Sequence, residues 1–309
     1  MKTNTKNIKH KRPSVITIGT FDGVHIGHQK IIKRLVETGK KKDLRSIVLT
    51  FFPHPRMVLQ PDFDIKLLHS IDERQTVLSQ FGLDELVIKK FTKAFADLSA
   101  QDYVKQILVE ELNAKHIIIG YDHHFGKNRT ANIDDLKIFG KQYGFTVEEI
   151  SAQDIEDVAV SSTKIRQSLL KGDIETANSF LGYPYFITGK VIKGKGIGKT
   201  LNFPTANLDI KETYKLIPKD GVYVVKSSID DSPVYGMMNI GNNPTFKGNK
   251  QSIEVHFFDL DKNLYDKTLN IEILYRLRDE RKFDSVERLK EQLQNDELNA
   301  LKLISKHHE

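Results

Sequence analysis

The sequence predicts an α/β fold in two domains, a parallel sheet covered by helices on both faces and then a small antiparallel barrel. Strand and helix patterns alternate over roughly the first 180 residues. After about residue 183 only short strand-like runs follow, and one long helical pattern at 284–305 closes the chain. We therefore expect domains at 13–183 and 184–309, with the boundary near "FLGYPY" (180–185).

The first domain reads as successive strand–helix–strand units. Its expected strands are 14–19, 45–51, 84–91, 115–120 and 145–150, and its main helices are 28–39, 71–82, 99–114 and 132–144. Ser99 is a good N-cap, and Gly39 ends the first helix. This order implies a parallel sheet, in which ligands bind beyond the carboxyl ends of the strands. The loops "GTFDG" and "GYDHHFG" follow the first and fourth strands, so we expect them to meet at one edge.

The second domain shows short apolar runs separated by Gly, Asn, Asp and Pro, which is typical of antiparallel strands. These runs are 185–194, 220–229, 232–241, 252–260 and 267–278. Strands at such spacing predict a small barrel.

The composition excludes several classes of protein. There are no cysteines, so disulfides, thiolate metal sites and cysteine nucleophiles are excluded, which fits a reducing cytoplasm. No apolar run approaches the length that spans a bilayer, and the N-terminus lacks the apolar segment of a secretory signal. We therefore expect a cytoplasmic protein with no membrane partner.

The net charge of +6 is concentrated at the N-terminus. Residues 1–12 contribute +5 of it, which leaves +1 for the rest of the chain. We interpret residues 1–12 as a basic, disordered extension and expect no nucleic-acid partner, because such a partner requires basic charge clustered on the folded body. Self-association stays open.

The stretch "GTFDGVHIGHQKII" (19–32) places His25 and His28 three residues apart around Gly27, where a helix begins. Unpaired N–H groups and a partial positive charge at a helix N-terminus favour phosphate. Imidazoles there can donate hydrogen bonds to a phosphoryl group as its charge develops. Two surface histidines, or a metal site with Asp22 as the nearest acid, are the alternatives. The sequence favours phosphate.

A second candidate phosphate motif is "SSTKIR" (161–166), just before an apolar helical pattern. Its hydroxyl groups and N–H groups lie at a helix start, and Arg166 is a bidentate phosphate donor. Without other evidence the segment is also compatible with an ordinary N-cap.

The "HIGH" segment resembles the signature of the HIGH-type nucleotidylyl transferases and of class I aminoacyl-tRNA synthetases, which activate ATP at its α-phosphate. A synthetase would also carry a lysine-rich "KMSKS"-like loop, which this chain lacks, and "SSTKIR" resembles the second ATP-binding motif of the transferases. The resemblance implies a Rossmann-like domain in which His25 and His28 are catalytic. It implies ATP-binding positions at Gly19, Phe21, Asp22, Gly23, Asp122, Ser161, Ser162, Thr163 and Arg166.

Two further segments, "TFFPHPRMVL" (50–59) and "GYDHHFGKNRTAN" (120–132), resemble the "TFxPHP" and "GxDFxFGxxRxG" segments of bacterial FAD synthetases. His123 and His124 replace the usual aromatic residue and its neighbour, and Thr130–Ala131 stands where the last glycine of the segment is expected. The resemblance implies flavin-loop positions at Phe52, Pro53, His54, Pro55, Phe125 and Gly126.

The glycine-rich stretch "GKVIKGKGIGKTLNFPTANL" (189–208) is not a nucleotide-binding P-loop. A Walker A motif would need glycine where Lys193 stands, and no dinucleotide fingerprint is present either. Thr205 and Asn207 offer hard oxygen ligands that suit Mg²⁺ beside phosphates. A proline-containing turn capped by these two residues is the alternative.

The same stretch resembles the riboflavin kinase signature "GFPTANL", with Asn202 for the usual glycine and Lys199 for the usual arginine. Four later segments follow in the order of that family: 221–225, 238–246, 253–269 and 276–296. The resemblance implies a six-stranded antiparallel barrel with a C-terminal helix, Mg²⁺ on Thr205 and Asn207, and Glu254 as general base. It implies ATP-binding positions at Gly194, Gly196, Gly198, Lys199, Pro204, Thr205 and Asn207.

Together these segments cover about residues 13–300 and resemble the bacterial bifunctional riboflavin kinase/FAD synthetases. The resemblance implies that the second domain makes FMN and ADP from riboflavin and ATP, with Mg²⁺. The first domain then makes FAD and pyrophosphate from FMN and ATP. Two alternatives stay open: an enzyme with one silenced site, and an RNA-binding or regulatory protein on the same fold, against which the +1 charge of the body argues.

Overall fold

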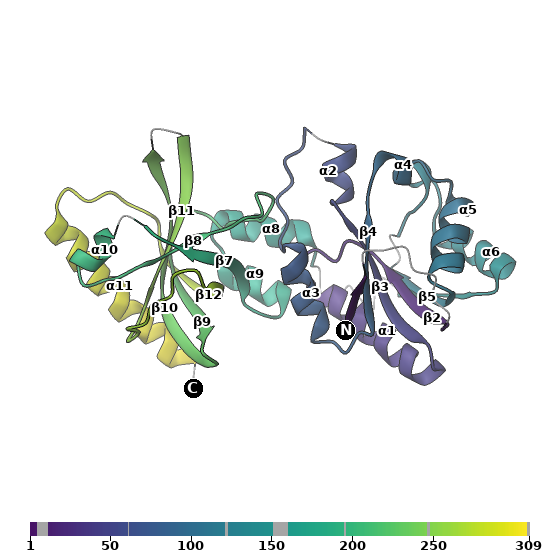
Figure 1. The fold of residues 1–309 in the computed structure, drawn as a ribbon, viewed down its shortest axis with the longest axis horizontal. Coiled ribbons are helices and arrows are strands. Elements are labelled where there is room, and N and C mark those ends of the chain that lie inside the picture. Colours follow the sequence, from purple (N-terminus) through teal and green to yellow (C-terminus); the bar gives the residue numbers. More distant parts are fainter. Residues whose placement is uncertain are drawn as a thin grey trace. The chain divides into compact units, whose positions relative to one another are not determined.

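The computed structural model describes residues 1–4, 12–60, 62–120, 123–150, 160–194, 196–245 and 248–307. The chain divides into two compact units, Met1–Ser162 and Thr163–Glu309. Figure 1 shows a sheet with helices in the first unit and a barrel in the second.

The first unit contains a six-stranded sheet in the order β1-β4-β3-β2-β5-β6, with parallel pairing throughout. This confirms the predicted α/β domain. Its strands are β1 (Lys2–Asn4), β2 (Ser14–Ile18), β3 (Arg45–Phe52), β4 (Glu85–Lys90), β5 (Ala114–Gly120) and β6 (Thr146–Ile150). Its helices are α1 (Ile26–Lys42), α2 (Pro55–Leu59), α3 (Ile71–Ser79), α4 (Lys93–Ala96), α5 (Ala100–Asp102), η1 (Tyr103–Glu111), η2 (Lys127–Arg129) and α6 (Ile133–Tyr143).

Both faces of this sheet are buried. Ile16, Ile47 and Ile117 form one core with η1 and α6, whereas α1 buries its own apolar stripe against β2, β3 and β5. All five residues of β2 are buried, as expected for a central strand of a parallel sheet. Because β2 and β5 pair in parallel, their carboxyl ends lie at the same edge of the sheet.

Two elements differ from the sequence-based expectation. Lys2–Asn4 pairs in parallel with β4, so the expected disordered tail does not hold for these residues, and residues 5–11 lie outside the described ones. Ser99 does cap a helix, accepting from Asp102 N at 3.0 Å. That helix then winds as a π-helix from Tyr103 to Glu111, which the spacing of its apolar residues did not predict.

The second unit is a closed barrel in the order β10-β11-β8-β7-β12-β9, with antiparallel pairing throughout. This confirms the predicted barrel and C-terminal helix. The strands are β7 (Tyr185–Ile192), β8 (Ala206–Asp209), β9 (Gly221–Ile229), β10 (Ser232–Thr245), β11 (Gly248–Phe257) and β12 (Thr268–Arg278). The helices are α8 (Ser162–Lys171), α9 (Ile174–Leu181), α10 (Ile197–Thr200) and α11 (Val286–His307).

Helices α8 and α9 belong to the barrel unit from Thr163 onward. Asn178 Nδ2 donates to Ile273 O at 2.9 Å, and Asn178 Oδ1 accepts from Tyr185 N at 2.7 Å. Leu169 O accepts from Lys219 N at 3.0 Å. The two compact units therefore divide after residue 162, and the domain boundary near residue 183 stays a prediction.

A buried ion pair attaches α11 to the barrel. Arg278 Nη2 lies 2.6 Å from Asp296 Oδ2, and its Nε donates to both oxygens of the same carboxylate at 3.0 Å. Gln292 Nε2 donates to Asp296 Oδ1 at 2.7 Å, and Asp296 is 2% exposed. Apolar side chains of α11, including Ala300 and Ile304, also pack on the barrel.

We expect Asp296→Ala to lower the free energy of unfolding of the second unit by about 3 kcal/mol, because the Arg278 charge loses its buried partner. Urea unfolding of the full chain measures this. Asp284→Ala is the matched control: its partner Arg288 lies at 3.2 Å, but both side chains are exposed. It should change stability by less than about 1 kcal/mol. Equal effects from both variants would contradict a structural role of the buried pair.

Candidate active sites of the two units

The turn between β2 and α1 holds the two histidines. Phe21, Gly23 and Val24 all have positive φ angles, of 47°, 84° and 35°. The chain then enters α1 with His25 as the N-cap residue, whose Nδ1 accepts from the backbone N–H of His28 at 3.4 Å. A side-chain acceptor at this position compensates an otherwise unpaired N–H of the first helical turn.

The two imidazole rings stack face to face. Their centroids are 3.7 Å apart and their planes differ by 19°. His25 is only 7% exposed, which argues against the alternative of two surface histidines. Among the described residues, no group of three His, Cys, Asp or Glu side chains could hold a metal ion.

Burial keeps both histidines neutral near neutral pH. It lowers the pKa of His25 to about 4, although the nearby Asp22 carboxylate acts in the opposite direction. Burial also lowers the pKa of His28 well below its usual value, with further lowering by the charges of His25, Arg74 and His69. Because Nδ1 of neutral His25 accepts a hydrogen bond, its proton lies on Nε2, where it can be donated to a ligand.

Acidification should destabilise the first unit. The unfolded state binds a proton at His25 below its ordinary pKa of 6.5, but the folded state does so only near 4. Stability is therefore lost as the pH falls through this window, by about 3 kcal/mol in total. Urea unfolding of the full chain across the window measures the loss. His25→Gln should show a shallower pH dependence, and an unchanged slope would contradict this origin.

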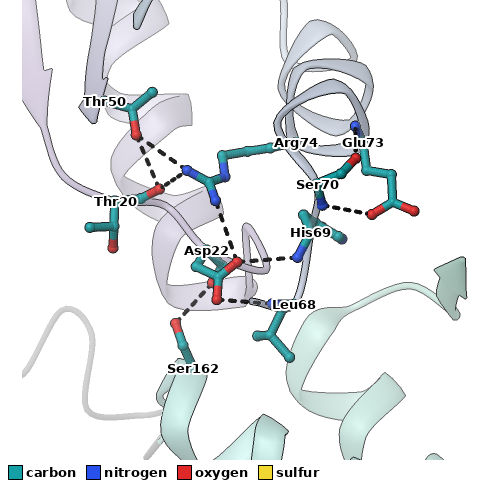
Figure 2. A network of polar contacts seen from close by, with 9 residues as sticks. All are labelled: Thr20, Asp22, Thr50, Leu68, His69, Ser70, Glu73, Arg74 and Ser162. Carbon is teal, nitrogen blue, oxygen red and sulfur yellow. Dashed lines mark hydrogen bonds and ion pairs between the residues drawn. The ribbon is translucent and has the colours of Figure 1, made fainter. Parts of the chain in front are cut away.

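Asp22 is buried among groups of the protein. Its carboxylate accepts from Leu68 N at 3.0 Å and His69 N at 3.2 Å, and it lies 3.5 Å from the guanidinium of Arg74 (Figure 2). The carbonyl oxygen of Asp22 accepts from Ser162 Oγ at 2.8 Å. This bond places the first hydroxyl of α8 against the histidine turn.

The other expected ATP-binding residues have fewer described contacts with the histidine turn. Gly19 directly follows β2, and its N–H donates to Leu49 O at 3.1 Å. Ser161 is half-buried just before α8. Asp122 lies outside the described residues, and Thr163 and Arg166 belong to the second unit, so their part at the histidine site stays a prediction.

An aromatic cluster lies at the carboxyl ends of β3 and β4 and includes one of the predicted flavin-loop residues. Phe125 packs at 5.8 Å from Tyr103, and Tyr103 packs edge-on at 6.0 Å from Phe95. Phe51 and Phe91 continue the cluster, each within 5.8 Å of Phe95 or of one another. The sequence analysis did not identify Phe91, Phe95 and Tyr103, although the aromatic residues that closely follow β4 (Glu85–Lys90) were a usable signal.

The predicted flavin loops have well-defined local geometry. Gly126 has a φ of 74°, and a Cβ there would lie 2.9 Å from Ala100 Cα, so only glycine fits. In the other loop, Phe52–Pro53 is a cis peptide bond, and His54 caps α2 by accepting from Arg56 N at 3.2 Å. Pro55 occupies the first turn of that helix, where its missing N–H costs nothing.

In the second unit, several expected kinase residues lie together on neighbouring strands. Thr205 Oγ1 donates to Glu254 Oε2 at 3.1 Å, and Glu254 lies opposite Asn207 in the β8–β11 ladder. A Cβ on Gly194 would collide with the Asn207 side chain, so the glycine-rich loop lies directly against that amide. The hydroxyl, amide and carboxylate therefore form one polar cluster.

The rest of the glycine-rich segment forms the one-turn helix α10, which contains Gly198 and Lys199 and has Gly196 as its N-cap. The carbonyl of Pro204 bonds to the ring of His256 at 2.9 Å. Asn202, where the kinase signature has glycine, has a φ of 64°. Asparagine tolerates this left-handed conformation better than most residues, so the departure preserves the backbone shape.

Two family models match the chain, one for each unit. The model of FAD synthetase matches residues 7–164, and the model of riboflavin kinase matches residues 181–304. A bifunctional riboflavin kinase/FMN adenylyltransferase of Buchnera aphidicola is 38% identical over 92% of this chain and 91% of its own length. The chain belongs to the bifunctional riboflavin kinase/FMN adenylyltransferase family. The homologue with that description from Bacillus subtilis is also 38% identical, over 94% of this chain and 93% of its own.

A solved structure from Streptococcus pneumoniae has the same overall fold. It is described as a macrolide-efflux protein, is 34% identical, and superimposes with a TM-score of 0.87 over 96% of this chain and 97% of its own. Within the described part of this chain, no helix is long and apolar enough to cross a membrane. The domain models and the bifunctional relatives agree with one another and carry the family assignment.

These matches confirm the predicted family and a function in flavin cofactor biosynthesis, as a kinase and a nucleotidyltransferase in one chain. Both domain models match, so the alternatives of an enzyme with one silenced site and of an RNA-binding protein receive no support. Riboflavin, FMN, FAD and ATP are the substrates and products of this enzyme type.

Proposed function

We propose that the second unit phosphorylates riboflavin to FMN and that the first unit transfers AMP from ATP to that FMN. The stacked pair of His25, which is buried, and His28, which is half-buried, at the start of α1 carries the proposal for the first unit. The contact between Thr205 and Glu254 inside the kinase cluster carries it for the second.

In the adenylyl transfer proposed for the first unit, a phosphate oxygen of FMN attacks the α-phosphorus of ATP as the bond to the β-phosphate oxygen breaks, and pyrophosphate leaves. Negative charge builds up on the α-phosphate oxygens. Neutral imidazole N–H groups of His25 and His28, together with the N-terminus of α1, stabilise that charge. Ser162, held on the same turn, and Arg166 are the proposed ligands of the phosphate tail. Catalysis then needs positioning and electrostatics, without a protein nucleophile.

In the kinase reaction, the 5′-hydroxyl of the ribityl chain attacks the γ-phosphorus of ATP and ADP leaves. Glu254 takes the hydroxyl proton as the general base. Thr205 and Asn207 offer the hydroxyl and amide oxygens that suit Mg²⁺, and they lie beside that carboxylate. When bound, Mg²⁺ supplies charge neutralisation for the phosphates. The glycine-rich loop at Gly194 packs against Asn207, which supports a place for the phosphates over this cluster.

The aromatic cluster around Phe125 is the proposed support for the flavin ring in the first unit. Flat aromatic side chains bind a flat ring by offset stacking and edge contacts. His123 stacks on Phe125 with centroids 6.0 Å apart and planes at 24°, in the position where related enzymes carry an aromatic residue. The imidazole of His123 therefore extends the aromatic cluster in place of that residue.

We also propose a cytoplasmic location, from the absence of cysteines.

One assay tests both reactions. The full chain is incubated with riboflavin, ATP and Mg²⁺, and the flavins are separated over time. We expect FMN to form first and FAD to follow. A second incubation supplies FMN directly and should give FAD without the kinase step. FMN as the final product would show that the first unit is silent, and no flavin product would overturn the proposal.

A further inference from the structure

We propose that Arg74 is a positioning residue for FAD formation: it fixes the turn Thr20–His25, and through it both histidines, without touching a substrate. This inference rests on the proposed function of the histidines. Arg74 is 1% exposed, which excludes it from direct contact with ATP or flavin. No family motif quoted for this chain includes it.

The start of α3 aims Arg74 at the turn. Ser70 and Glu73 form a reciprocal capping box, with bonds of 2.8 Å from Ser70 N and 3.1 Å to Ser70 Oγ. Arg74 N then donates to Ser70 O at 3.0 Å. A capped first turn cannot fray easily, so the guanidinium projects from a fixed base.

The guanidinium holds the turn at two points (Figure 2). Its Nη1 donates to Thr20 O at 2.7 Å, and its Nη2 lies 3.5 Å from Asp22 Oδ1. Thr50 Oγ1 reinforces the first point by donating to Thr20 O at 3.1 Å. Asp22 is itself bound to the backbone that leads into α3 at Leu68. A planar donor with several N–H groups can connect two such acceptors, whereas an ammonium group is a single point of charge.

The turn needs this support because its backbone is strained. Phe21 and Val24 are non-glycine residues with positive φ, and such conformations persist only where surrounding contacts enforce them. His25 follows directly, and its ring stacks on His28. A relaxation of the turn would therefore move both rings, and a displacement of about 1 Å can lower a rate about 10²-fold.

Arg74 also contributes a fixed positive charge beside the histidines. The pKa of His28 is lowered first by burial and then by the charges of His25, Arg74 and His69. Asp22 is the acidic group that acts on His25 from the same turn. Removing the charge of Arg74 should raise the pKa of His28, whereas lysine in its place should not. Charge and geometry can thus be separated by two variants.

The test compares Arg74→Lys and Arg74→Gln in the full chain. Both should lower kcat for FAD formation about 10- to 100-fold, because neither side chain spans both acceptors. FMN formation by the same molecules should be unchanged, which provides an internal measure of intact protein. The imidazole titration of His28, assigned by NMR against His28→Ala, should move to higher pH in Arg74→Gln but not in Arg74→Lys.

Arg45→Gln is the matched control. Arg45 pairs with Glu85 at 3.2 Å at the start of β3, the opposite edge of the same sheet. It should leave kcat per folded molecule and the His28 titration unchanged. Normal kcat per folded molecule in both Arg74 variants would overturn the inference, as would an equal loss in Arg45→Gln. If His28→Ala itself keeps FAD formation, the proposed function of the histidines fails, whatever the Arg74 variants do.

Discussion

Replacing His28 with alanine should stop the reaction at FMN. We expect FAD formation to fall by about 10²–10³-fold or more, because one donor to the developing charge on the α-phosphate is lost. The stacked partner His25 also loses the ring that fixes its orientation. Riboflavin phosphorylation should continue at its normal rate, so FMN should accumulate when the variant is given riboflavin, ATP and Mg²⁺.

His116→Ala is the matched control for this variant. His116 is another histidine of the same unit and is 5% exposed. Its Nε2 lies 3.1 Å from Glu148 Oε2, and neither residue is part of the histidine turn. It lies near the start of β5, so its loss should affect stability but not kcat per folded molecule. FAD formation that survives in His28→Ala would falsify the role assigned to the histidine pair.

The sequence was sufficient for those parts of the first unit that rest on local pattern. Buried β-branched runs predicted the parallel strands, and the start of α1 after a glycine-containing loop predicted the site of His25 and His28. Residues that act from a distance were not predictable in this way. Arg74 binds a carbonyl 54 positions earlier in the chain, and no spacing rule connects two such segments. The same holds for Tyr103, whose ring contacts Phe125 only because the fold brings these two segments together.

Other differences have physical causes that periodicity does not reveal. The spacing of apolar residues in 103–111 buries the same side chains in an α-helix and in a π-helix. Strand β8 has only four residues, too few to show alternation, and it was expected only from the resemblance to riboflavin kinases. The compact units divide after residue 162 because Asn178 of α9 bonds to the barrel, whereas the riboflavin kinase model begins at residue 181, close to the expected domain boundary.

Glu254→Gln should have the opposite effect on the flavins. The amide keeps the size of the side chain and can still accept from Thr205, but it cannot take the ribityl proton. Loss of a general base costs about 10²–10⁴-fold, so FMN formation from riboflavin should nearly cease. FMN supplied directly should still become FAD, because the histidine site lies in the other unit.

Glu272→Gln provides the comparison for this variant. Glu272 is also a half-buried glutamate on a barrel strand, and it lies on β12, 4.0 Å from Lys226. Its replacement should leave both reactions unchanged. The pair of variants therefore separates the chemistry of one carboxylate from the stability of the barrel. Normal FMN formation in Glu254→Gln would assign the base to another group, whereas loss of both reactions would indicate that the chain no longer folds. Together with His28→Ala, the expected outcome assigns each reaction to one unit of the chain.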